Sequence, residues 1–452
     1  MVMQAEIKKY VDENFAGLGI NKQQQTLRLL YEISKRENLK PQDIFKDIRK
    51  KPGTFVSLKK HLLARRFPRL TSACEDIKPY LPKLDINDSL RADISAVKIA
   101  PKAIYVENCV KESFLAKRLK TLFSEADFIT IPSLKEYIKN KKFTAEEYNK
   151  RRERFFIIRE KYDFFKKCPC TSGAMPCGYH VFNLGVGCVY ECTYCYLQEY
   201  TNSPGIIIPA NIEDFFDAFK QYKQNIRLGT GEFTDSLALD HITNFSIALV
   251  DFFKAYPKTT FELKTKSNNI ETLLTTKPAK NIVIGWSLNP QNIVRSNEFL
   301  SASLKDRLDA AAKCVDAGFS AAFHFDPIFY YKGWEKDYQG LVNMLFDKIS
   351  PKHIKWISLG TFRFSPGLKR IIENRFPENK ILDEELVLGF DNKLRYGEKQ
   401  RAGIYKNMLG WIHSRSKSVY TYLCMESKQQ CERFESVRTT CLPAGREPEK
   451  RS

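Results

Sequence analysis

Three cysteines lie close together in the segment from Cys188 to Cys195, where Cys192 is the middle one and the spacing is C-x3-C-x2-C. Thiolates are soft ligands that suit iron–sulfur clusters, zinc and copper. A [4Fe–4S] cluster normally takes four cysteine ligands, so three thiolates on one loop can hold three irons and leave the fourth iron open to a small molecule. Structural zinc takes four ligands that usually come as two close pairs, and no second pair follows at zinc-finger spacing. The spacing therefore favours an iron–sulfur cluster with one open iron over a zinc site.

Three more cysteines, Cys168, Cys170 and Cys177, precede this loop. They could ligate a second cluster or metal, but the sequence shows no fourth ligand for it. Free cysteines also serve as small buried hydrophobes. Both interpretations stay open at this stage.

The composition indicates a folded, basic protein. The chain has 452 residues, of which 43% are hydrophobic, so it is long enough for a large domain with a smaller one beside it. Lys and Arg exceed Asp and Glu by 73 to 53, which gives a net charge of +20. Such a charge favours a polyanionic partner, and nucleic acid is the first candidate. The alternative is a basic surface that only interacts with solvent.

The sequence predicts neither a membrane span nor export. No run approaches the roughly 18 apolar residues that a membrane helix needs, and the segment from Met1 to Glu6 lacks the basic and apolar blocks of a signal peptide. Twelve cysteines without a secretory signal are typical of a reducing compartment. We therefore expect a cytoplasmic protein.

Residues 1–95 are expected to form a basic helical lobe. Hydrophobic residues recur at helical spacing in 21–38 and 54–66. The second of these helices carries or adjoins several cations that could grip phosphates, or that simply face solvent: Lys59, Lys60, Arg65, Arg66 and Arg69.

From residue 177 to 385 the pattern alternates between strand and helix, which predicts a parallel sheet. Right-handed crossovers would curl that sheet into part of a TIM-type barrel, with functional groups at the carboxyl ends of its strands. The predicted strands are 179–184, 226–233, 260–264, 282–288, 319–325 and 354–359. The cysteine loop follows the first of them.

Shorter segments flank this predicted barrel. Residues 96–176 are expected to form a small α/β lead-in with strands at 103–107 and 127–131 and a polar helix at 144–154. We expect residues 386–435 to form a C-terminal extension with a hairpin and residues 436–452 to form a disordered tail.

His324 and Asp326 share one face of the fifth predicted barrel strand, because side chains two apart point the same way. They could be a substrate-binding pair or part of a satisfied polar layer.

The segment Cys188 to Gln198, which ends in Cys-Tyr-Leu-Gln, resembles the cluster loop of the spore photoproduct lyase family of radical SAM enzymes. The similarity continues through 231–235, 265–267, 286–287, 326–328, 333–335 and 363–364. The resemblance implies a partial (β/α)6 barrel, a [4Fe–4S] cluster, S-adenosylmethionine (SAM) as cofactor, and lyase-type repair of a thymine photoproduct in DNA. It also implies an electron donor such as flavodoxin or ferredoxin.

The same resemblance assigns roles to individual residues. Cys188, Cys192 and Cys195 would hold the cluster, and Tyr194 would lie by the SAM adenine. Tyr194 and Tyr196 would relay a hydrogen atom. The polar contacts to the methionyl part of SAM would come from Thr234, Lys266 and Ser287.

One position departs from the family pattern. Glu232 occupies the place of the hydrogen-donating cysteine, and a carboxylate cannot give a hydrogen atom to a carbon radical as a thiol can. Glu232 instead resembles the glutamate that accepts from the SAM amino group in other radical SAM enzymes. Cys177 or Cys314 could replace the missing donor. The departure leaves open a substrate in RNA, a peptide or a small molecule, and a metal-stabilised nucleic-acid-binding protein without catalysis remains a further alternative.

Overall fold

The computed structural model describes residues 2–46, 54–74, 78–95, 99–141, 143–200, 205–222 and 225–434. The tail predicted at 436–452 lies outside these residues. Contacts divide the chain into two compact units. Unit 1 combines Met1–Ala92 with Phe329–Lys332 and Thr361–Ile404, and unit 2 holds the remaining segments. Unit 1 is therefore assembled from segments far apart in the sequence.

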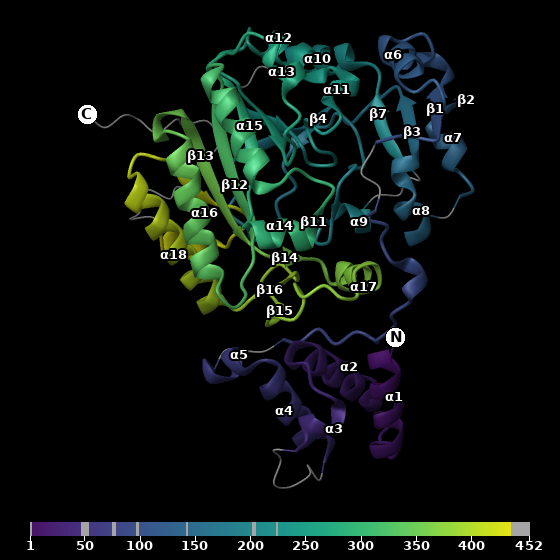
Figure 1. Cartoon of the computed structure of the whole chain (residues 1–452), viewed down its shortest axis with the longest axis vertical. Helices are drawn as coiled ribbons and strands as arrows, with labels where there is room; N and C mark the ends of the chain where they lie inside the picture. The colour runs from purple at the N-terminus through teal and green to yellow at the C-terminus, as the bar shows by residue number, and fades with distance from the viewer. Residues whose placement is uncertain are drawn as a thin grey trace. The chain divides into compact units, whose positions relative to one another are not determined.

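Helices dominate the N-terminal part of unit 1 (Figure 1). They are α1 (Val2–Asn14), α2 (Ile20–Glu37), α3 (Pro41–Ile44), α4 (Phe55–Arg66) and α5 (Pro68–Ser72). The side chain of Thr54 caps α4 by accepting a hydrogen bond from the Ser57 amide at 3.3 Å. Leu30 of α2 and Leu58 and Leu62 of α4 are buried in one core, which confirms the predicted helical faces.

The C-terminal part of unit 1 contributes α17 (Pro366–Arg375) and a small sheet of β14 (Arg363–Phe364), β16 (Leu394–Tyr396) and β15 (Leu386–Leu388). The predicted hairpin is confirmed, since β15 and β16 pair antiparallel with Leu386 opposite Tyr396. Helix α18 (Glu398–Arg415) follows.

Several cations of the N-terminal lobe are occupied inside unit 1. Arg66 is 1% exposed and donates to Glu32 at 2.8 Å, Arg65 pairs with Glu37 at 2.8 Å, and Arg69 pairs with Glu384. Arg66 is buried and cannot reach a phosphate, and the ion pairs of the partly exposed Arg65 and Arg69 already offset their charge. Of the five cations proposed to grip phosphates, only Lys59 and Lys60 fall outside these ion pairs, and Lys60 is exposed.

Glu32 is the acidic centre of this unit. Burial opposes its ionisation, but Lys369, Arg66 and Arg28 outweigh burial and lower the pKa of Glu32 from 4.5 to about 2. Lys369 lies closest, at 2.6 Å. The lowered pKa means that the ionised carboxylate stabilises the fold above its unfolded pKa.

We therefore expect the chain to lose roughly 3 kcal/mol of stability through Glu32 as the pH falls from about 4.5 to about 2. A Glu32→Gln variant should be less stable at neutral pH and should lack this acid-dependent loss. Denaturant unfolding at a series of pH values measures how the unfolding free energy of each protein changes with pH. Equal slopes in the two proteins over that range would contradict the prediction, and Glu13→Gln, at an exposed position of α1, is the control.

Unit 2 begins with a four-stranded parallel sheet in the order β2-β1-β3-β7. The strands are β1 (Ala103–Glu107), β2 (Asp127–Ile131), β3 (Arg154–Ile158) and β7 (Ile206–Pro209), and α6 (Phe114–Leu122) connects the first two. The prediction of β1 and β2 is confirmed. Two strands of this sheet, β3 and β7, were not predicted.

The helix predicted at 144–154 is wrong in its second half. The α-helix α8 spans only Ala145–Asn149, a 3-10 turn covers Arg151–Glu153, and β3 starts at Arg154. The charged run before β3 suggested one continuous polar helix. The apolar residues Phe155 to Ile157 are fully buried, and their burial in a sheet decides the conformation.

The second sheet of unit 2 has the order β17-β13-β12-β10-β9-β8-β5-β4 and curls into a half-barrel (Figure 1). Its strands are β4 (Phe165–Lys167), β5 (Tyr179–Phe182), β8 (Arg227–Thr230), β9 (Thr260–Thr265), β10 (Ile282–Ser287), β12 (Ser320–Ile328), β13 (Ile354–Thr361) and β17 (Thr421–Leu423). Strand β4 is antiparallel to β5, and β5 begins a run of parallel neighbours through β8, β9, β10 and β12. All six barrel strands predicted from the alternating pattern are present.

Helices alternate with these strands. They are α10 (Ile212–Lys220), α11 (Asp240–Thr243), α12 (Phe245–Phe253), α13 (Glu271–Leu274), α14 (Gln291–Asn297), α15 (Leu304–Asp316) and α16 (Trp334–Lys348). Ser303 caps α15 by accepting a hydrogen bond from the Asp306 amide at 3.2 Å. None of the helices in the described part of the chain is long and apolar enough to cross a membrane.

A buried polar layer crosses the half-barrel. The His324 ring hydrogen-bonds Ser358 Oγ at 2.6 Å and Glu262 Oε1 at 2.5 Å. His324 is 4% exposed. It is therefore a satisfied member of a polar layer, which is one of the two interpretations that the sequence left open.

Candidate active site at the cysteine loop

The cysteine loop leaves the half-barrel at the carboxyl end of β5 and leads to β7 of the smaller sheet. Within the loop, Glu191–Cys192 forms the short strand β6, which pairs antiparallel with β11 (Glu298–Phe299) and places Glu298 opposite Cys192. Val186 also bridges to Ile207 of β7. The loop is thereby anchored to unit 2 by pairing with β11 and with β7.

Arg151 clamps the first half of the loop. Its side chain is 1% exposed and donates to the Cys188 carbonyl at 3.0 Å, to the Tyr190 carbonyl at 2.7 Å and to the carboxylate of Glu191. A guanidinium can serve several acceptors because its donors form a rigid planar fork. No signal in the sequence distinguished Arg151 from the basic residues around it.

Gln198 holds the second half of the loop. Its Nε2 lies within hydrogen-bonding distance of the carbonyls of Cys192, Thr193 and Cys195, at 3.2, 3.0 and 3.1 Å. Thr193 Oγ1 also donates to Asn297 Oδ1 at 2.8 Å. These contacts fix the backbone that carries the last two cysteines.

The three thiols lie near one another on this loop, with Cys192 buried and Cys188 and Cys195 partly exposed. Burial raises the pKa of Cys188 to about 12, and Asp235 and Cys195 add to this rise. Burial also raises the pKa of Cys192 well above its usual value, whereas Lys266 acts in the opposite direction. The net rise keeps these thiols protonated at neutral pH, so a metal that binds here would displace their protons.

Lys266 is the cation beside these thiols. Burial would lower its pKa, but the charges of Glu298 and Cys192 outweigh burial and raise it. Its Nζ lies 5.7 Å from the centre of the Tyr194 ring. Lys266 therefore stays protonated at neutral pH next to the cysteine loop.

Glu298 organises the groups around Lys266. It is 1% exposed, its Oε2 lies 2.6 Å from Arg307 Nη1, and its Oε1 accepts from the Tyr194 hydroxyl and, at 2.9 Å, from Asn289. Burial disfavours the charged carboxylate, yet Arg307 and Lys266 lower the pKa of Glu298 to about 2. The sequence contained no signal for Glu298, because two of its partners, Tyr194 and Lys266, come from distant segments.

Asp235 ties the loop after β8 to the end of β9. Its Oδ1 accepts from Thr265 Oγ1 at 2.6 Å and its Oδ2 from the Lys266 amide at 2.7 Å. Gly231 makes this approach possible: its φ is +97°, and a Cβ there would lie 2.8 Å from the Lys264 carbonyl oxygen. Asp235 thus positions the backbone of Lys266.

Thr234 and Ser287 take different places around this centre. Thr234 lines an internal cavity of about 30 Å³ beside Asp235, which has room for about one water. Ser287 ends β10, is 4% exposed, and its carbonyl accepts from Arg307 at 3.0 Å. Their assigned contacts to SAM stay predictions.

Glu232 and Tyr196 meet at the side of the loop. The Tyr196 hydroxyl donates to the Glu232 carbonyl oxygen at 2.5 Å, and the Tyr196 side chain is 39% exposed. Burial raises the pKa of the Glu232 carboxyl, although Lys166 acts in the opposite direction. Glu232 Oε2 is buried without a hydrogen-bond partner, so a ligand amino group would satisfy it.

The two cysteines suggested as substitute donors lie elsewhere in unit 2. Cys314 is 1% exposed on α15, which packs on β10 and β12, and burial raises its pKa to about 12. Cys177 precedes the amino end of β5, whereas the cysteine loop follows the carboxyl end of that strand. Neither thiol takes the place of Glu232.

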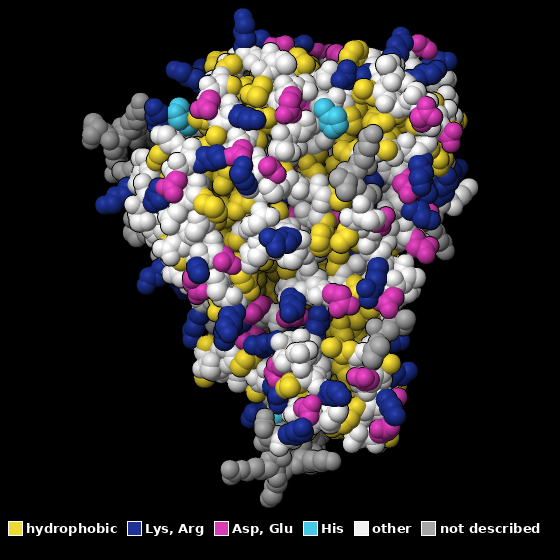
Figure 2. Space-filling model, viewed as in Figure 1, with side chains coloured by type: hydrophobic (Ala, Val, Ile, Leu, Met, Phe, Trp, Pro, Cys, Tyr) yellow, Lys and Arg dark blue, Asp and Glu magenta, His cyan; other side chains and the backbone are white. Residues whose placement is uncertain are grey.

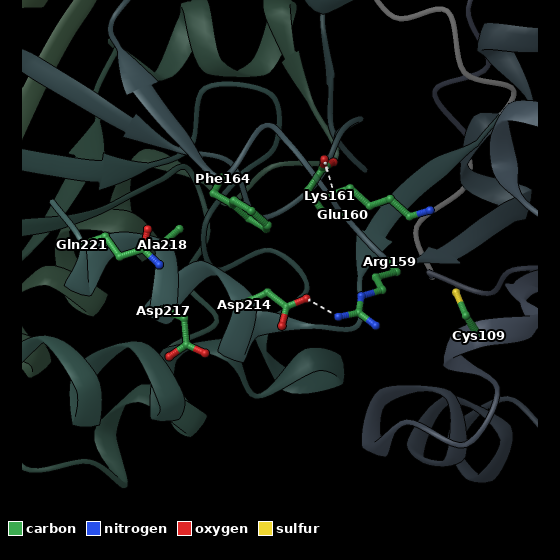
Figure 3. Close-up of a pocket in the computed structure, with 9 residues that line it drawn as sticks. All are labelled: Cys109, Arg159, Glu160, Lys161, Phe164, Asp214, Asp217, Ala218 and Gln221. Carbon is green, nitrogen blue, oxygen red and sulfur yellow. Dashed lines mark hydrogen bonds and ion pairs between the residues drawn. The ribbon is translucent and has the colours of Figure 1, made fainter.

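A separate hollow of about 650 Å³ opens between α10 and the segment before β4 (Figure 3). Figure 3 shows Arg159 reaching toward Asp214, at 3.0 Å. None of the predicted site residues lines it. The lining residues are Cys109, Arg159, Glu160, Lys161, Phe164, Asp214, Asp217, Ala218 and Gln221.

Known proteins with a similar sequence or fold support the family resemblance. The family model for spore photoproduct lyase matches residues 99–410. The chain belongs to the spore photoproduct lyase family. Spore photoproduct lyase of Bacillus subtilis (strain 168) is 26% identical over 299 residues, which cover 63% of this chain and 85% of that protein. The lyase of Clostridium acetobutylicum is 24% identical over 248 residues, covering 53% and 70%.

Solved spore photoproduct lyases share the fold. One complexed with dinucleoside spore photoproduct has a TM-score of 0.62 at 22% identity and covers 72% of this chain and 99% of its own. A variant with bound AdoMet and dinucleoside spore photoproduct has a TM-score of 0.62 at 21% identity, covering 73% and 100%. These matches confirm the predicted partial TIM-type barrel.

The family is one of radical SAM lyases that use a [4Fe–4S] cluster and SAM. The site residues fit these groups. Three adjacent thiols suit a cluster with an open iron, Lys266 can pair with a carboxylate, and the buried Glu232 Oε2 lacks a donor.

Proposed function

We propose that this chain holds a [4Fe–4S] cluster through Cys188, Cys192 and Cys195, and binds SAM at the open iron to start radical repair of a damaged base in DNA. The observation that carries the proposal is the position of the Lys266 cation within electrostatic range of Cys192 and Cys195, on the loop that also carries Cys188. Membership in the spore photoproduct lyase family supports the reaction class.

The bound cofactors would supply the electron and the radical that abstracts hydrogen, and the protein would position them. Lys266 would pair with the SAM carboxylate, while Glu232 would accept from the SAM amino group. Ser287 and Thr234 would add hydrogen bonds to the methionyl part. Glu298 would keep Lys266 charged and hold the Tyr194 ring in place for the adenine.

Tyr196 is the better candidate for a hydrogen-atom relay. Its side chain is 39% exposed, whereas the Tyr194 hydroxyl is committed to the buried Glu298. A phenol can give and regain a hydrogen atom only if the substrate reaches its oxygen. We therefore assign the relay to Tyr196 and an orienting role to Tyr194.

Nucleic acid is the proposed substrate, and DNA is favoured. The net charge of +20 supports a polyanion. Figure 2 shows Lys and Arg spread over the visible face with Asp and Glu between them. To reach a base in a duplex, the enzyme would extrude the nucleotide, at a cost of roughly a few kcal/mol. A flavodoxin or ferredoxin is the proposed electron donor.

The first test is cofactor cleavage. Anaerobically reconstituted protein, reduced with dithionite, should form 5′-deoxyadenosine from SAM, and Cys192→Ala should lose this activity entirely because one iron loses its ligand. Cys314→Ala, which removes a buried thiol outside the loop, should retain it. Product at the wild-type rate in Cys192→Ala would refute the assigned cluster.

A second test addresses the substrate. Active protein should bind and repair oligonucleotides that contain thymine photoproducts, as judged by chromatography of the digested DNA. The absence of a thiol at Glu232 favours one rival, a radical SAM enzyme acting on RNA, a peptide or a small molecule. Robust cleavage of SAM with no binding to intact or damaged DNA would favour that rival.

A further inference from the structure

A seam of unit 2 joins the loop before β5 to the segment after β17. Ala174 forms an antiparallel bridge with Ser427, and the Met175 amide donates to the Glu426 carbonyl at 2.8 Å. Strand β17 is an edge of the curled sheet, and β5 lies next to the other edge. These contacts therefore bring segments near the two edges of the half-barrel together.

Four cysteines gather at this seam. Cys168 follows β4, and its amide donates to the Tyr179 carbonyl at 2.8 Å. Cys170 lies two residues on, and its amide donates to the Cys168 carbonyl at 2.8 Å. Cys177 and Cys424 both pack against one buried apolar cluster inside the half-barrel. The fourth cysteine that the sequence did not reveal is therefore Cys424, placed there by the return of β17.

The thiols themselves lie within interaction range of one another. A hydrogen bond with Cys170 raises the pKa of Cys168, and burial and the neighbouring Cys424 and Cys177 raise it further. Arg227 acts on Cys177 in the opposite direction, although burial still raises the pKa of Cys177. The seam thus gathers four soft sulfur donors in one part of unit 2.

We propose that Cys168, Cys170, Cys177 and Cys424 bind a second metal centre, separate from the cluster of the Cys188 loop. Four thiolates are the complete ligand set of either a structural zinc ion or an iron–sulfur cluster. Cys168 and Cys177 lie at the amino end of β5, and the Cys188 loop follows its carboxyl end. The two sets of thiols therefore share no ligand.

Metal binding would have to draw the thiols closer. Among the residues that the structure describes, no three His, Cys, Asp or Glu side chains are already arranged to hold a metal ion, and this includes the Cys188 loop. Three of the seam cysteines lie on or beside the connecting segment between β4 and β5, where side chains can adjust. The bound metal would fasten the seam and hold the half-barrel edges together, as structural metals do in other folds.

Metal analysis of cysteine variants tests this proposal. Protein produced with iron and zinc supplied is purified anaerobically, and iron, zinc and acid-labile sulfide are measured per chain. The wild type should contain both metal centres. Cys192→Ala should keep only the centre at the seam cysteines. Cys424→Ala should lose the seam centre but should still cleave SAM. Cys314→Ala is the matched control and should keep both. Cys170→Ala is the second seam variant if Cys424→Ala does not fold.

Each outcome decides the matter. Iron with sulfide in Cys192→Ala identifies a second cluster, and zinc without sulfide identifies a single ion. A Cys192→Ala protein without metal would overturn the proposal, as would seam variants with wild-type metal content. Two oxidised thiols in place of a metal would also overturn it by showing a disulfide. If the Cys188 loop binds no cluster, the metal bound by the four seam cysteines can still be measured. The proposed function and the second metal centre can therefore be refuted independently.

Discussion

Replacing Arg151 with alanine should remove the iron–sulfur cluster and destabilise the chain by about 3–5 kcal/mol. The guanidinium is 1% exposed and bonds the Cys188 and Tyr190 carbonyls as well as the Glu191 carboxylate. Without it, Glu191 loses its cation in a buried position, and the first half of the loop loses its clamp. Iron per chain and denaturant unfolding measure the two effects.

Two variants separate charge from geometry. Arg151→Lys keeps the cation but cannot span the same acceptors, so we expect it to regain part of the stability and little of the iron. Arg152→Ala removes the neighbouring arginine, which donates to the Asp93 carbonyl at 2.8 Å near the surface, and should keep the cluster. Full iron content in Arg151→Ala would show that the loop holds its shape without the clamp.

Replacing Glu298 with glutamine should weaken SAM binding and make it more sensitive to alkaline pH. The pKa of Lys266 is raised because Glu298 and Cys192 outweigh burial, and the variant loses the larger of these two charges. A raised pKa supports binding below that pKa, and the benefit is lost as the pH rises through it. The variant lowers the pKa of Lys266, so SAM binding should weaken at a lower pH than in the wild type. Where Lys266 becomes neutral, the Kd for SAM should rise roughly tenfold or more.

Calorimetric titration of reconstituted protein with SAM between about pH 7 and 9.5 checks this expectation, because Lys titrates normally near 10.4. Glu335→Gln removes an exposed carboxylate on α16 and is the charge-matched control. The unfolding free energy should also fall, since the buried Arg307 loses its 2.6 Å partner. An unchanged pH profile in a folded Glu298→Gln protein would show that Lys266 does not bind the cofactor.

The features that the sequence predicted well are local ones. The C-x3-C-x2-C spacing depends on neighbouring residues only, and strands β1 and β2 have the bounds expected from their apolar runs. The alternation of strand and helix predicted the barrel because the spacing of hydrophobic residues differs between strands and helices and can be recognised within each element. The antiparallel hairpin of β15 and β16 was likewise foreseen from a short turn.

Features that depend on distant partners were missed. Strands β3 and β7 are short, and they become strands through pairing with distant segments: β3 with β1 and β7, and β7 with β3. In the sequence, Arg151 is one of several neighbouring basic residues, and only the structure shows that its side chain is buried against the loop. Unit 1 likewise joins the N-terminal helices to residues 361–404, a division that no linear boundary expresses.

The sequence by itself predicted the ligand chemistry of the Cys188 loop, and it determined the loop's place after a barrel strand and the family resemblance, since all three reside in contiguous residues. Only the tertiary structure decided which charges serve that loop: Glu298 opposite Cys192, Lys266 held charged between them and Arg151 behind Cys188. It also placed Cys424 near Cys168 and Cys177. The physical reason is that a pKa or a ligand set depends on distances in space, and those distances arise only when the strands close into the half-barrel.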